Sequence, residues 1–319
     1  MCFGFDGDGA LDRSLAEKGA SRRGLFRGAA LGAAGVAAAG TGLLAPAQAK
    51  GKKPGGTPGE RTVEHDKISI QLYTLRAAMS TPAGVDLVLD RLAQYGYQHV
   101  ELAGLYGRTA RAMRLQLDGL GIRASSSHDG ISADPTALET KLRNAVILGQ
   151  KYINVPYLNS NNLADWQRWA DQMNVEAEAA KKVGLRYGYH NHAHEFTIDL
   201  GNGLTPWEVF TERLDKKLVH LEVDLYWAYT AGVNTGAKDP NKFAIEVIKD
   251  APQMVRQYHV KDRDGTTGDM CDLGTGVVDF PKIFSRFTAE QFIVENDTPD
   301  VTPLTSAAVG HLYLDHVKF

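Results

Sequence analysis

Short runs of apolar and β-branched residues recur along the chain and alternate with longer stretches in which apolar residues follow a helical period. Eight such runs have the length of buried strands: residues 68–74, 99–104, 122–128, 152–158, 185–192, 218–227, 255–262 and 291–297. Amphipathic stretches such as 83–96 and 163–184 separate them, and the second has Lys181, Lys182 and Gly184 at its end, as a helix C-terminus favours. The pattern predicts an α/β protein.

Eight strand–helix units within residues 62–319 favour one closed parallel barrel, a single (β/α)8 TIM barrel. A doubly wound open sheet is the alternative. Such a sheet commonly carries a glycine-rich fingerprint after its first strand, and no such fingerprint follows residues 68–74. The even repeat of the units therefore favours the barrel.

The N-terminal part reads as an export signal. SRRGLFR (21–27) precedes an uncharged Ala- and Gly-rich stretch that closes on AQA (47–49), so residues 1–49 are predicted to be a cleaved twin-arginine signal peptide. A membrane anchor is the alternative interpretation. Residues 50–61 are rich in Gly, Pro and charge and are predicted to be a flexible linker. We expect a periplasmic or secreted protein whose partners include the twin-arginine export machinery.

Composition and charge limit the classes of partner that the protein is expected to bind. The net charge is −3, and no basic run follows the linker, which argues against nucleic acid. No apolar stretch after the signal has the length of a membrane span. Cys2 lies in the signal, so Cys271 has no partner for an intrachain disulfide in the mature chain. Stability must then come from the core, which a chain of this length can build.

Polar side chains gather where the predicted strands end. Active sites of parallel barrels lie at the C-terminal ends of the strands. The residues found there are Gln71, Glu101, His128, His190, His192, Asp224, His259, Lys261 and Glu295. Nearly every strand thus delivers a polar or ionisable group to one rim, which predicts a functional site at the barrel mouth.

Strand alternation turns four of these side chains toward the same point. Because side chains alternate in and out, the last four strands present His190, Asp224, His259 and Glu295 to the interior. Two carboxylates and one or two imidazoles buried together would destabilise one another without a cation between them. Mixed His and carboxylate ligands suit Mn²⁺, Zn²⁺, Co²⁺ or Fe²⁺, whereas Ca²⁺ prefers oxygen alone. The alternatives are that Asp224 caps a turn and that Glu295 pairs with Lys261.

The motifs ISIQLYTLR, HVELAGLYG, YGYHNHAHEF, LEVDLYWAYTAG, YHVKDRD, DLGTGVVDF and IVENDTP occur in that order. Together they resemble the sugar phosphate isomerase/epimerase-like family of xylose-isomerase-type barrels over essentially all of the mature chain. The resemblance implies a divalent metal ion (Mn, Zn, Co, Fe or Mg) held by Asp224, His259 and Glu295. The fourth ligand is either His190, where ketose epimerases of the family have Glu, or Glu195 folding back from its loop. Thr275 also departs from the family pattern, where relatives usually have Glu.

The resemblance further implies proton abstraction next to a carbonyl, with a metal-stabilised enediolate, by an isomerase, an epimerase or a lyase. The substrate class is a sugar, keto-sugar or cyclitol, and the expected export favours an unphosphorylated one. We expect Glu195, His192 and Glu295 to handle protons. Substrate contacts are expected from Gln71, Glu101, His128, Trp227 and Lys261. The alternatives are a metal-dependent hydrolase of the AP-endonuclease type, which would want a basic groove, and a non-catalytic sugar-binding barrel.

Overall fold

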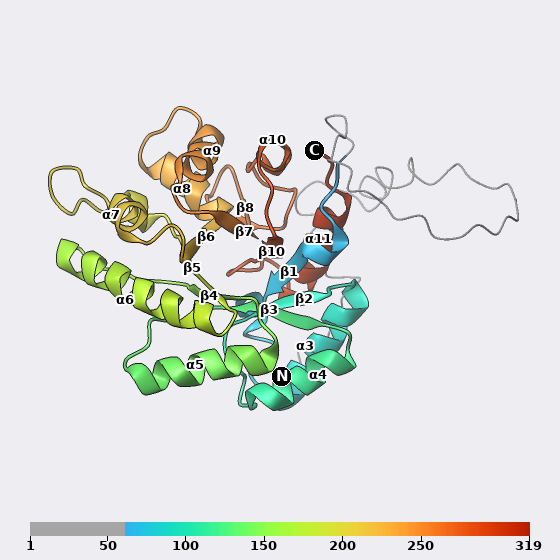
Figure 1. The fold of residues 1–319 in the computed structure, drawn as a ribbon. Helices are drawn as coiled ribbons and strands as arrows, with labels where there is room; N and C mark the ends of the chain where they lie inside the picture. The colour runs from blue at the N-terminus through green and yellow to red at the C-terminus, as the bar shows by residue number, and fades with distance from the viewer. Residues whose placement is uncertain (1–60) are drawn as a thin grey trace, which may run out of the picture.

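The computed structural model describes residues 61–319 and contains one sheet of eight parallel strands wound into a barrel (Figure 1). Its strands are β1 (Ile68–Gln71), β2 (His99–Leu102), β3 (Arg123–Ser127), β4 (Tyr152–Val155), β5 (Arg186–His190), β6 (Val219–Asp224), β7 (Val255–Val260) and β10 (Gln291–Val294). They neighbour one another in the order β3-β2-β1-β10-β7-β6-β5-β4. A short hairpin, β8 (Asp262–Arg263) with β9 (Met270–Cys271), comes after β7.

The two outermost strands, β3 and β4, meet and bring the sheet round on itself. A parallel bridge joins His128 to Asn154, and the Asp129 amide donates to the Asn154 carbonyl at 2.9 Å. The Lys151 amide donates to the Ser125 carbonyl, also at 2.9 Å. The predicted TIM barrel is therefore confirmed, and the open sheet is excluded for residues 61–319.

Helices alternate with the strands and surround them (Figure 1). They are α3 (Pro82–Tyr95), α4 (Ala110–Gly119), α5 (Pro135–Leu148), α6 (Leu163–Lys182), α7 (Pro206–Arg213), α8 (Leu225–Asn234), α9 (Pro240–Asp250), α10 (Phe280–Arg286) and α11 (Pro303–His316). Short 3₁₀ turns occupy His65–Lys67, Leu72–Leu75 and His194–Phe196. None of the helices within 61–319 is long and apolar enough to cross a membrane. The predicted signal peptide, 1–49, lies outside the described residues, as does all of the predicted linker except Arg61.

The helix ends follow from local sequence. In α3 the Thr81 hydroxyl accepts from the Gly84 amide at 3.0 Å, and Pro82 fills the first position, where no amide hydrogen is needed. α5 begins in the same way at Asp134 and Pro135. α3 stops at Gly96, whose φ of 96° is a left-handed conformation that favours glycine. α6 ends on Lys181 and Lys182, as predicted.

Each predicted run extends one to three residues past the strand that forms, and in two of them a side-chain hydrogen bond explains where the strand ends. The run 68–74 leaves the sheet at Gln71, whose side chain accepts from the Tyr73 amide and starts a 3₁₀ turn. The run 218–227 leaves it at Asp224, because Asp224 Oδ1 accepts from the Trp227 amide at 2.8 Å and caps α8. The prediction that the strand continues to Trp227 is wrong, since a cap can end a strand without a change in hydropathy.

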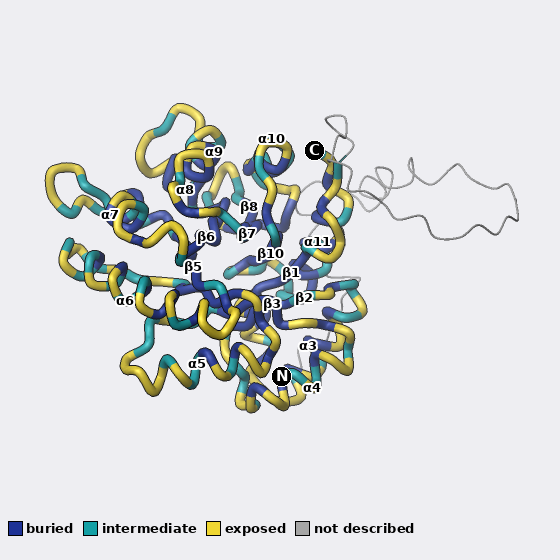
Figure 2. The backbone as a smooth tube through the Cα atoms, viewed as in Figure 1, coloured by how far each residue is buried: buried dark blue, intermediate teal, exposed yellow. Residues whose placement is uncertain are grey.

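The main apolar core lies between the strands and the helices. Figure 2 shows buried strands inside helices whose outer faces are exposed. On β7, Tyr258 stacks on Phe284 of α10, with 6.3 Å between the ring centroids. The alternate residues of β7, Gln257 and His259, are also fully buried but point into the barrel. The interior of this barrel is therefore polar, and its buried groups depend on one another for hydrogen bonds.

The N-terminal end of the barrel is closed by a charge cluster around Glu290. Its carboxylate accepts from Arg186 at 2.7 Å and from the Tyr152 hydroxyl at 2.5 Å, and it also bonds Lys151 and Arg256. Partial burial raises the pKa of Glu290, but the hydrogen bonds from Lys151, Tyr152 and Arg256 outweigh it and lower the pKa to about 2. Because the chemistry of such barrels lies at the opposite end, a charge cluster at this face serves stability.

Glu290→Gln should destabilise the protein near neutral pH by about 1–2 kcal/mol, the range of charge-assisted hydrogen bonds reduced by solvent screening. A carboxylate with a depressed folded-state pKa contributes stability above its unfolded pKa of about 4.3 and loses it as pH falls toward the folded value. The gap between wild type and variant should therefore narrow below about pH 4.3 in urea unfolding. Glu246→Gln, an exposed helix-surface change beside Lys242, is the control and should cost no more than about 0.5 kcal/mol. A difference in unfolding free energy between wild type and Glu290→Gln that does not change with pH would contradict the stabilising role of the ionised Glu290 carboxylate.

Candidate metal centre

The structure brings the four predicted ligands to one place. They come from the ends of neighbouring strands: His190 from β5, Asp224 from β6, His259 from β7 and Glu295 from just after β10. One potential ligand atom from each lies within 4.8 Å of those of the other three, and all four residues are buried. This spacing suits a single ion at the barrel mouth.

The donor atoms fit a divalent metal ion. His190 Nε2 lies 3.7 Å from Asp224 Oδ2, and His259 Nδ1 lies 2.6 Å from Glu295 Oε2. Asp224 Oδ2 is fully buried and has no contact with hydrogen-bond geometry among the described residues, although Lys261 Nζ lies 3.1 Å from it as an ion-pair partner; Oδ1 of the same carboxylate caps α8. A buried carboxylate oxygen needs a counter-charge, which Lys261 supplies in this structure and an ion could supply instead. Asp224 thus serves as a helix cap and still has an oxygen to offer an ion.

Lys261 is the cation nearest to these carboxylates. Its Nζ lies 3.1 Å from Asp224 Oδ2, 2.7 Å from Glu295 Oε2 and 3.1 Å from Asp297 Oδ2, and its side chain is only 1% exposed. Burial lowers the pKa of Lys261, but these three carboxylates outweigh it and raise the pKa well above its usual value. When all three carboxylates are ionised, one ammonium leaves two negative charges, which a divalent ion would balance.

Aromatic rings form one wall of the mouth. The Trp227 and His192 ring centroids are 5.2 Å apart, and Tyr157, which is 52% exposed, meets His192 edge-on at 5.1 Å. The Trp227 indole nitrogen and His192 Nδ1 are buried without a hydrogen-bond partner among the described residues. Burial and Lys261 lower the pKa of His192 to about 2, so its imidazole is neutral. Sequence reasoning missed Tyr157, which lies beyond the end of β4.

Glu195 does not join the cluster. Its carboxylate accepts from the Tyr189 hydroxyl at 2.6 Å and from the His192 amide at 2.9 Å, and it is fully buried. Tyr189 alternates with His190 on β5 and packs against Phe210 of α7, outside the barrel. The structure therefore places His190, not Glu195, with the other ligands. Through the His192 amide, Glu195 fixes the loop that carries His192.

Gln71 and Glu101, expected as substrate contacts, lie beneath the ligands instead. Both are fully buried, and Gln71 Nε2 donates to Glu101 Oε2 at 2.9 Å. The same oxygen lies 2.7 Å from His259 Nε2. Burial raises the pKa of Glu101, but His128 and His259 outweigh it and lower the pKa to about 2. Strand alternation correctly predicts that both side chains point into the barrel. It does not predict how far below the barrel mouth each side chain lies.

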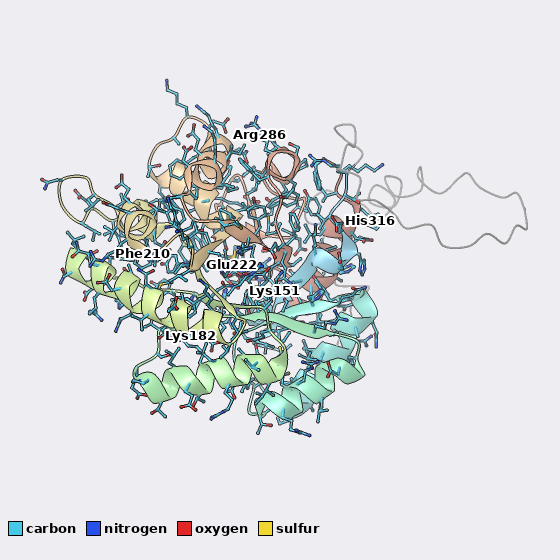
Figure 3. The ribbon with its side chains drawn as sticks, viewed as in Figure 1. Lys151, Lys182, Phe210, Glu222, Arg286 and His316 are labelled. Atoms are coloured by element: carbon cyan, nitrogen blue, oxygen red, sulfur yellow. The ribbon has the colours of Figure 1, made fainter. Side chains whose placement is uncertain are left out.

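His128 bridges this deeper layer and the mouth. Its Nε2 lies 2.8 Å from Glu222 Oε1, and its side chain is 11% exposed. Figure 3 labels Glu222 in the middle of the barrel. Strand alternation puts Glu222 on the inward face with Asp224, but the sequence did not single it out as a site residue. His128, His190, Glu222 and His259 form a second group whose potential ligand atoms also lie within 4.8 Å of one another.

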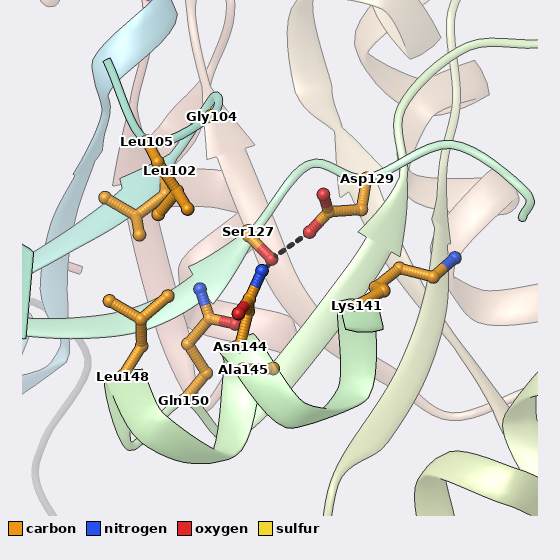
Figure 4. Close-up of a pocket in the computed structure, with 10 residues that line it drawn as sticks. All are labelled: Leu102, Gly104, Leu105, Ser127, Asp129, Lys141, Asn144, Ala145, Leu148 and Gln150. Carbon is orange, nitrogen blue, oxygen red and sulfur yellow. Dashed lines mark hydrogen bonds between the residues drawn. The ribbon is translucent and has the colours of Figure 1, made fainter. Parts of the chain in front are cut away.

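A separate small cavity lies between β3 and α5 (Figure 4). Ser127 and Asp129 line it, and the Ser127 hydroxyl donates to Asp129 at 2.5 Å. These two residues flank His128 along the chain and therefore face away from the barrel interior. None of the candidate ligands lines this cavity, so it is no part of the metal centre.

One relative resembles this chain in sequence, and two of the solved structures that share its fold match it along most of its length. Over 276 residues the chain is 24% identical to an inosose dehydratase of Geobacillus kaustophilus. The match covers 73% of this chain and 87% of the relative. A sugar phosphate isomerase/epimerase from Parabacteroides distasonis shares the fold with a TM-score of 0.64 and 22% identity, over 78% of this chain and 93% of that one. The IolI protein, solved with a bound zinc atom, matches with a TM-score of 0.55 and 15% identity, over 76% and 95%.

The family assignment rests on a match that spans most of the barrel. Residues 89–312, more than half of the chain, match the family described as Xylose isomerase-like TIM barrel. The matched range includes β2 to β10 and all four candidate ligands. The chain belongs to the xylose isomerase-like TIM barrel family.

Proposed function

We propose that the protein is a divalent-metal-dependent enzyme that removes a proton next to a carbonyl of a sugar, keto-sugar or cyclitol. The observation that carries the proposal is the group of His190, Asp224, His259 and Glu295, whose potential ligand atoms lie within 4.8 Å of one another, and in which the fully buried Asp224 Oδ2 faces Lys261 at 3.1 Å without hydrogen-bond geometry. A bound ion would act as a Lewis acid at the substrate carbonyl and stabilise the charge that develops on its oxygen.

The residues of this chain would divide the remaining work. Lys261 lies against Asp224 and Glu295 and can donate a hydrogen bond to a substrate oxygen beside them. His192 lies at the mouth and its Nδ1 has no hydrogen-bond partner among the described residues, so it is one candidate to accept or return a proton; Glu295 is a second candidate because its carboxylate lies in the same group. Trp227 offers an apolar ring face against which a sugar ring can stack, as well as an indole N–H without a partner among the described residues.

The fate of the deprotonated substrate decides the reaction class. Returning the proton to the neighbouring carbon isomerises, returning it to the other face epimerises, and losing a β-hydroxyl dehydrates. The relative from Geobacillus kaustophilus is an inosose dehydratase, which makes a cyclic polyol ketone a sensible first substrate to try. We also propose export by the twin-arginine route to the periplasm or beyond, on the sequence of residues 1–49. An exported enzyme would favour an unphosphorylated substrate such as a 3-keto-sugar or keto-glycoside.

Solvent deuterium incorporation tests the function directly. The metal-loaded protein is incubated in D₂O with inososes, 3-keto-sugars, keto-glycosides and their phosphorylated counterparts, and products are read by mass and NMR. We expect deuterium next to the carbonyl of at least one unphosphorylated ketone, its loss after chelation, and its return with added Mn²⁺, Co²⁺ or Zn²⁺. Exchange that survives complete metal removal would contradict the metal-dependent mechanism. A protein that binds these ketones but exchanges no proton would instead be a sugar-binding barrel.

A further inference from the structure

The two candidate ligand histidines each stand between the metal group and a deeper carboxylate. His259 directs Nδ1 to Glu295 Oε2 at 2.6 Å and Nε2 to Glu101 Oε2 at 2.7 Å. A histidine binds a metal ion through one neutral ring nitrogen, and the hydrogen bond made by the other decides which nitrogen keeps the proton. With Nε2–H donated to Glu101, the lone pair of His259 Nδ1 faces the metal group.

His190 is arranged the opposite way round. Its Nε2 lies 3.7 Å from Asp224 Oδ2, and its Nδ1 lies 3.4 Å from Glu222 Oε1. Nδ1 is buried and makes no hydrogen bond with any described residue. A proton on Nδ1 would face the Glu222 carboxylate, whose Oε1 lies 3.4 Å away. His190 would therefore keep its proton on Nδ1 and offer the lone pair of Nε2.

A single amide ties the two deeper carboxylates together. Asn154 Nδ2 donates to Glu222 Oε2 at 2.6 Å and to Glu101 Oε1 at 3.2 Å. The other oxygen of each carboxylate is thereby turned toward the histidines. All three residues are fully buried, so no solvent competes for these bonds. Such a layer keeps its geometry because moving any one of the three side chains would leave a buried hydrogen-bonding atom of another without its partner.

We propose that Glu101 and Glu222, tied by Asn154, are positioning residues that set opposite tautomers of the two ligand histidines. His259 carries its proton on Nε2 and His190 on Nδ1. The inference rests on the metal centre proposed above and assigns a role to the layer beneath it. Neither carboxylate touches the substrate in this arrangement.

The deeper group of His128, His190, Glu222 and His259 is the rival position for the ion. Hydrogen bonding favours the support role. Both oxygens of Glu101 and both of Glu222 already accept hydrogen bonds or face an imidazole nitrogen at hydrogen-bond distance. Asp224 Oδ2, in the upper group, has no contact with hydrogen-bond geometry among the described residues and is balanced by the Lys261 ammonium 3.1 Å away. The upper group therefore has an oxygen that an ion can take over from Lys261, whereas the carboxylate oxygens of the deeper group are already held by amides and imidazoles.

Glu101→Gln and Glu222→Gln in the full chain test the proposal. A glutamine amide can turn its own N–H toward the histidine, which then keeps its proton on the nitrogen that should bind the ion. Each variant should bind Zn²⁺ about 10–100-fold more weakly than wild type in competition with a chromophoric chelator, the usual effect of losing such a partner. Glu176→Gln is the matched control, because this carboxylate is 4% exposed and bonds Tyr187 and Lys141 away from the centre. It should change thermal stability but not zinc affinity.

Nitrogen-15 NMR of the zinc-loaded chain reads the tautomers themselves. Wild type should show one zinc-bound histidine protonated on Nε2 and the other on Nδ1, assigned with His190→Gln and His259→Gln. Identical tautomers, or Gln variants that bind zinc as tightly as wild type, would overturn the proposal. So would zinc lost from His128→Asn but kept by Asp224→Asn, which would place the ion in the deeper group. A wild type that binds no divalent ion overturns the metal centre as well, whereas normal wild-type binding with unchanged Gln variants overturns only this inference.

Discussion

Asp224→Asn should reduce turnover about 10³-fold, because it removes a charged ligand oxygen from the ion. The ion would then be lost or misplaced relative to the substrate carbonyl that it should polarise. The substitution separates the two roles of this residue. Asparagine is as good a helix cap as aspartate, and its amide oxygen can still accept from the Trp227 amide, so α8 should keep its start. The amide nitrogen then faces the metal group and cannot ligate an ion.

Rates of deuterium exchange and thermal unfolding, measured on the same preparations, check this expectation. Asp239→Asn makes the same chemical change at the cap of α9, where the side chain accepts from the Lys242 amide, and should leave the rate unchanged. Asp224→Ala should lose the same activity and about 1 kcal/mol more stability, from the missing cap. Wild-type turnover in Asp224→Asn would mean that the cap is the only role of this carboxylate.

Lys261→Met should have its largest effect on the metal-free protein. The ammonium is buried among Asp224, Glu295 and Asp297, and removing one partner of a buried ion pair costs about 3–5 kcal/mol. A divalent ion would supply the missing positive charge, so most of this loss should return when metal is added. Turnover with metal should remain about 10²-fold below wild type, because the hydrogen-bond donor to the substrate oxygen is gone.

Urea unfolding with and without metal, together with zinc affinity, measures these effects. Zinc should bind Lys261→Met at least as tightly as wild type, since the ammonium no longer competes for Asp224 and Glu295. Lys282→Met, a partly exposed change 4.0 Å from Asp239, should leave stability, affinity and turnover nearly unaltered. Weaker zinc binding by Lys261→Met would show that the lysine supports the ion rather than standing in for it.

The barrel could be predicted because its signal is repeated. Each of the eight strands appears as a short apolar or β-branched run, and the structure confirms all eight. The errors lie at the strand ends, where a side-chain oxygen rather than hydropathy decides the conformation. Gln71 and Asp224 both end a strand by accepting an amide hydrogen two or three residues later. The predicted signal peptide stays a prediction, since it lies outside the described residues.

The candidate ligands could be predicted because strand alternation fixes which face a side chain occupies. His190, Asp224 and His259 needed only that rule and the order of the strands. Glu195 escaped it, because a loop residue has no alternation and the Tyr189 hydroxyl draws it outside the barrel. Asn154 was visible as a lone polar residue within the apolar run YINV, but its bonds to Glu101 and Glu222 depend on strands far apart in sequence.

The position of the ion tests the proposed metal centre most directly. Crystals of the protein grown with Zn²⁺ or Mn²⁺ should give one strong anomalous difference peak at the barrel mouth. We expect it within bonding distance of His190 Nε2, Asp224 Oδ2, His259 Nδ1 and a Glu295 oxygen, with Lys261 moved away from Asp224. A peak among His128, Glu222 and His259 instead, or no peak with Lys261 still between Asp224 and Glu295, would contradict it.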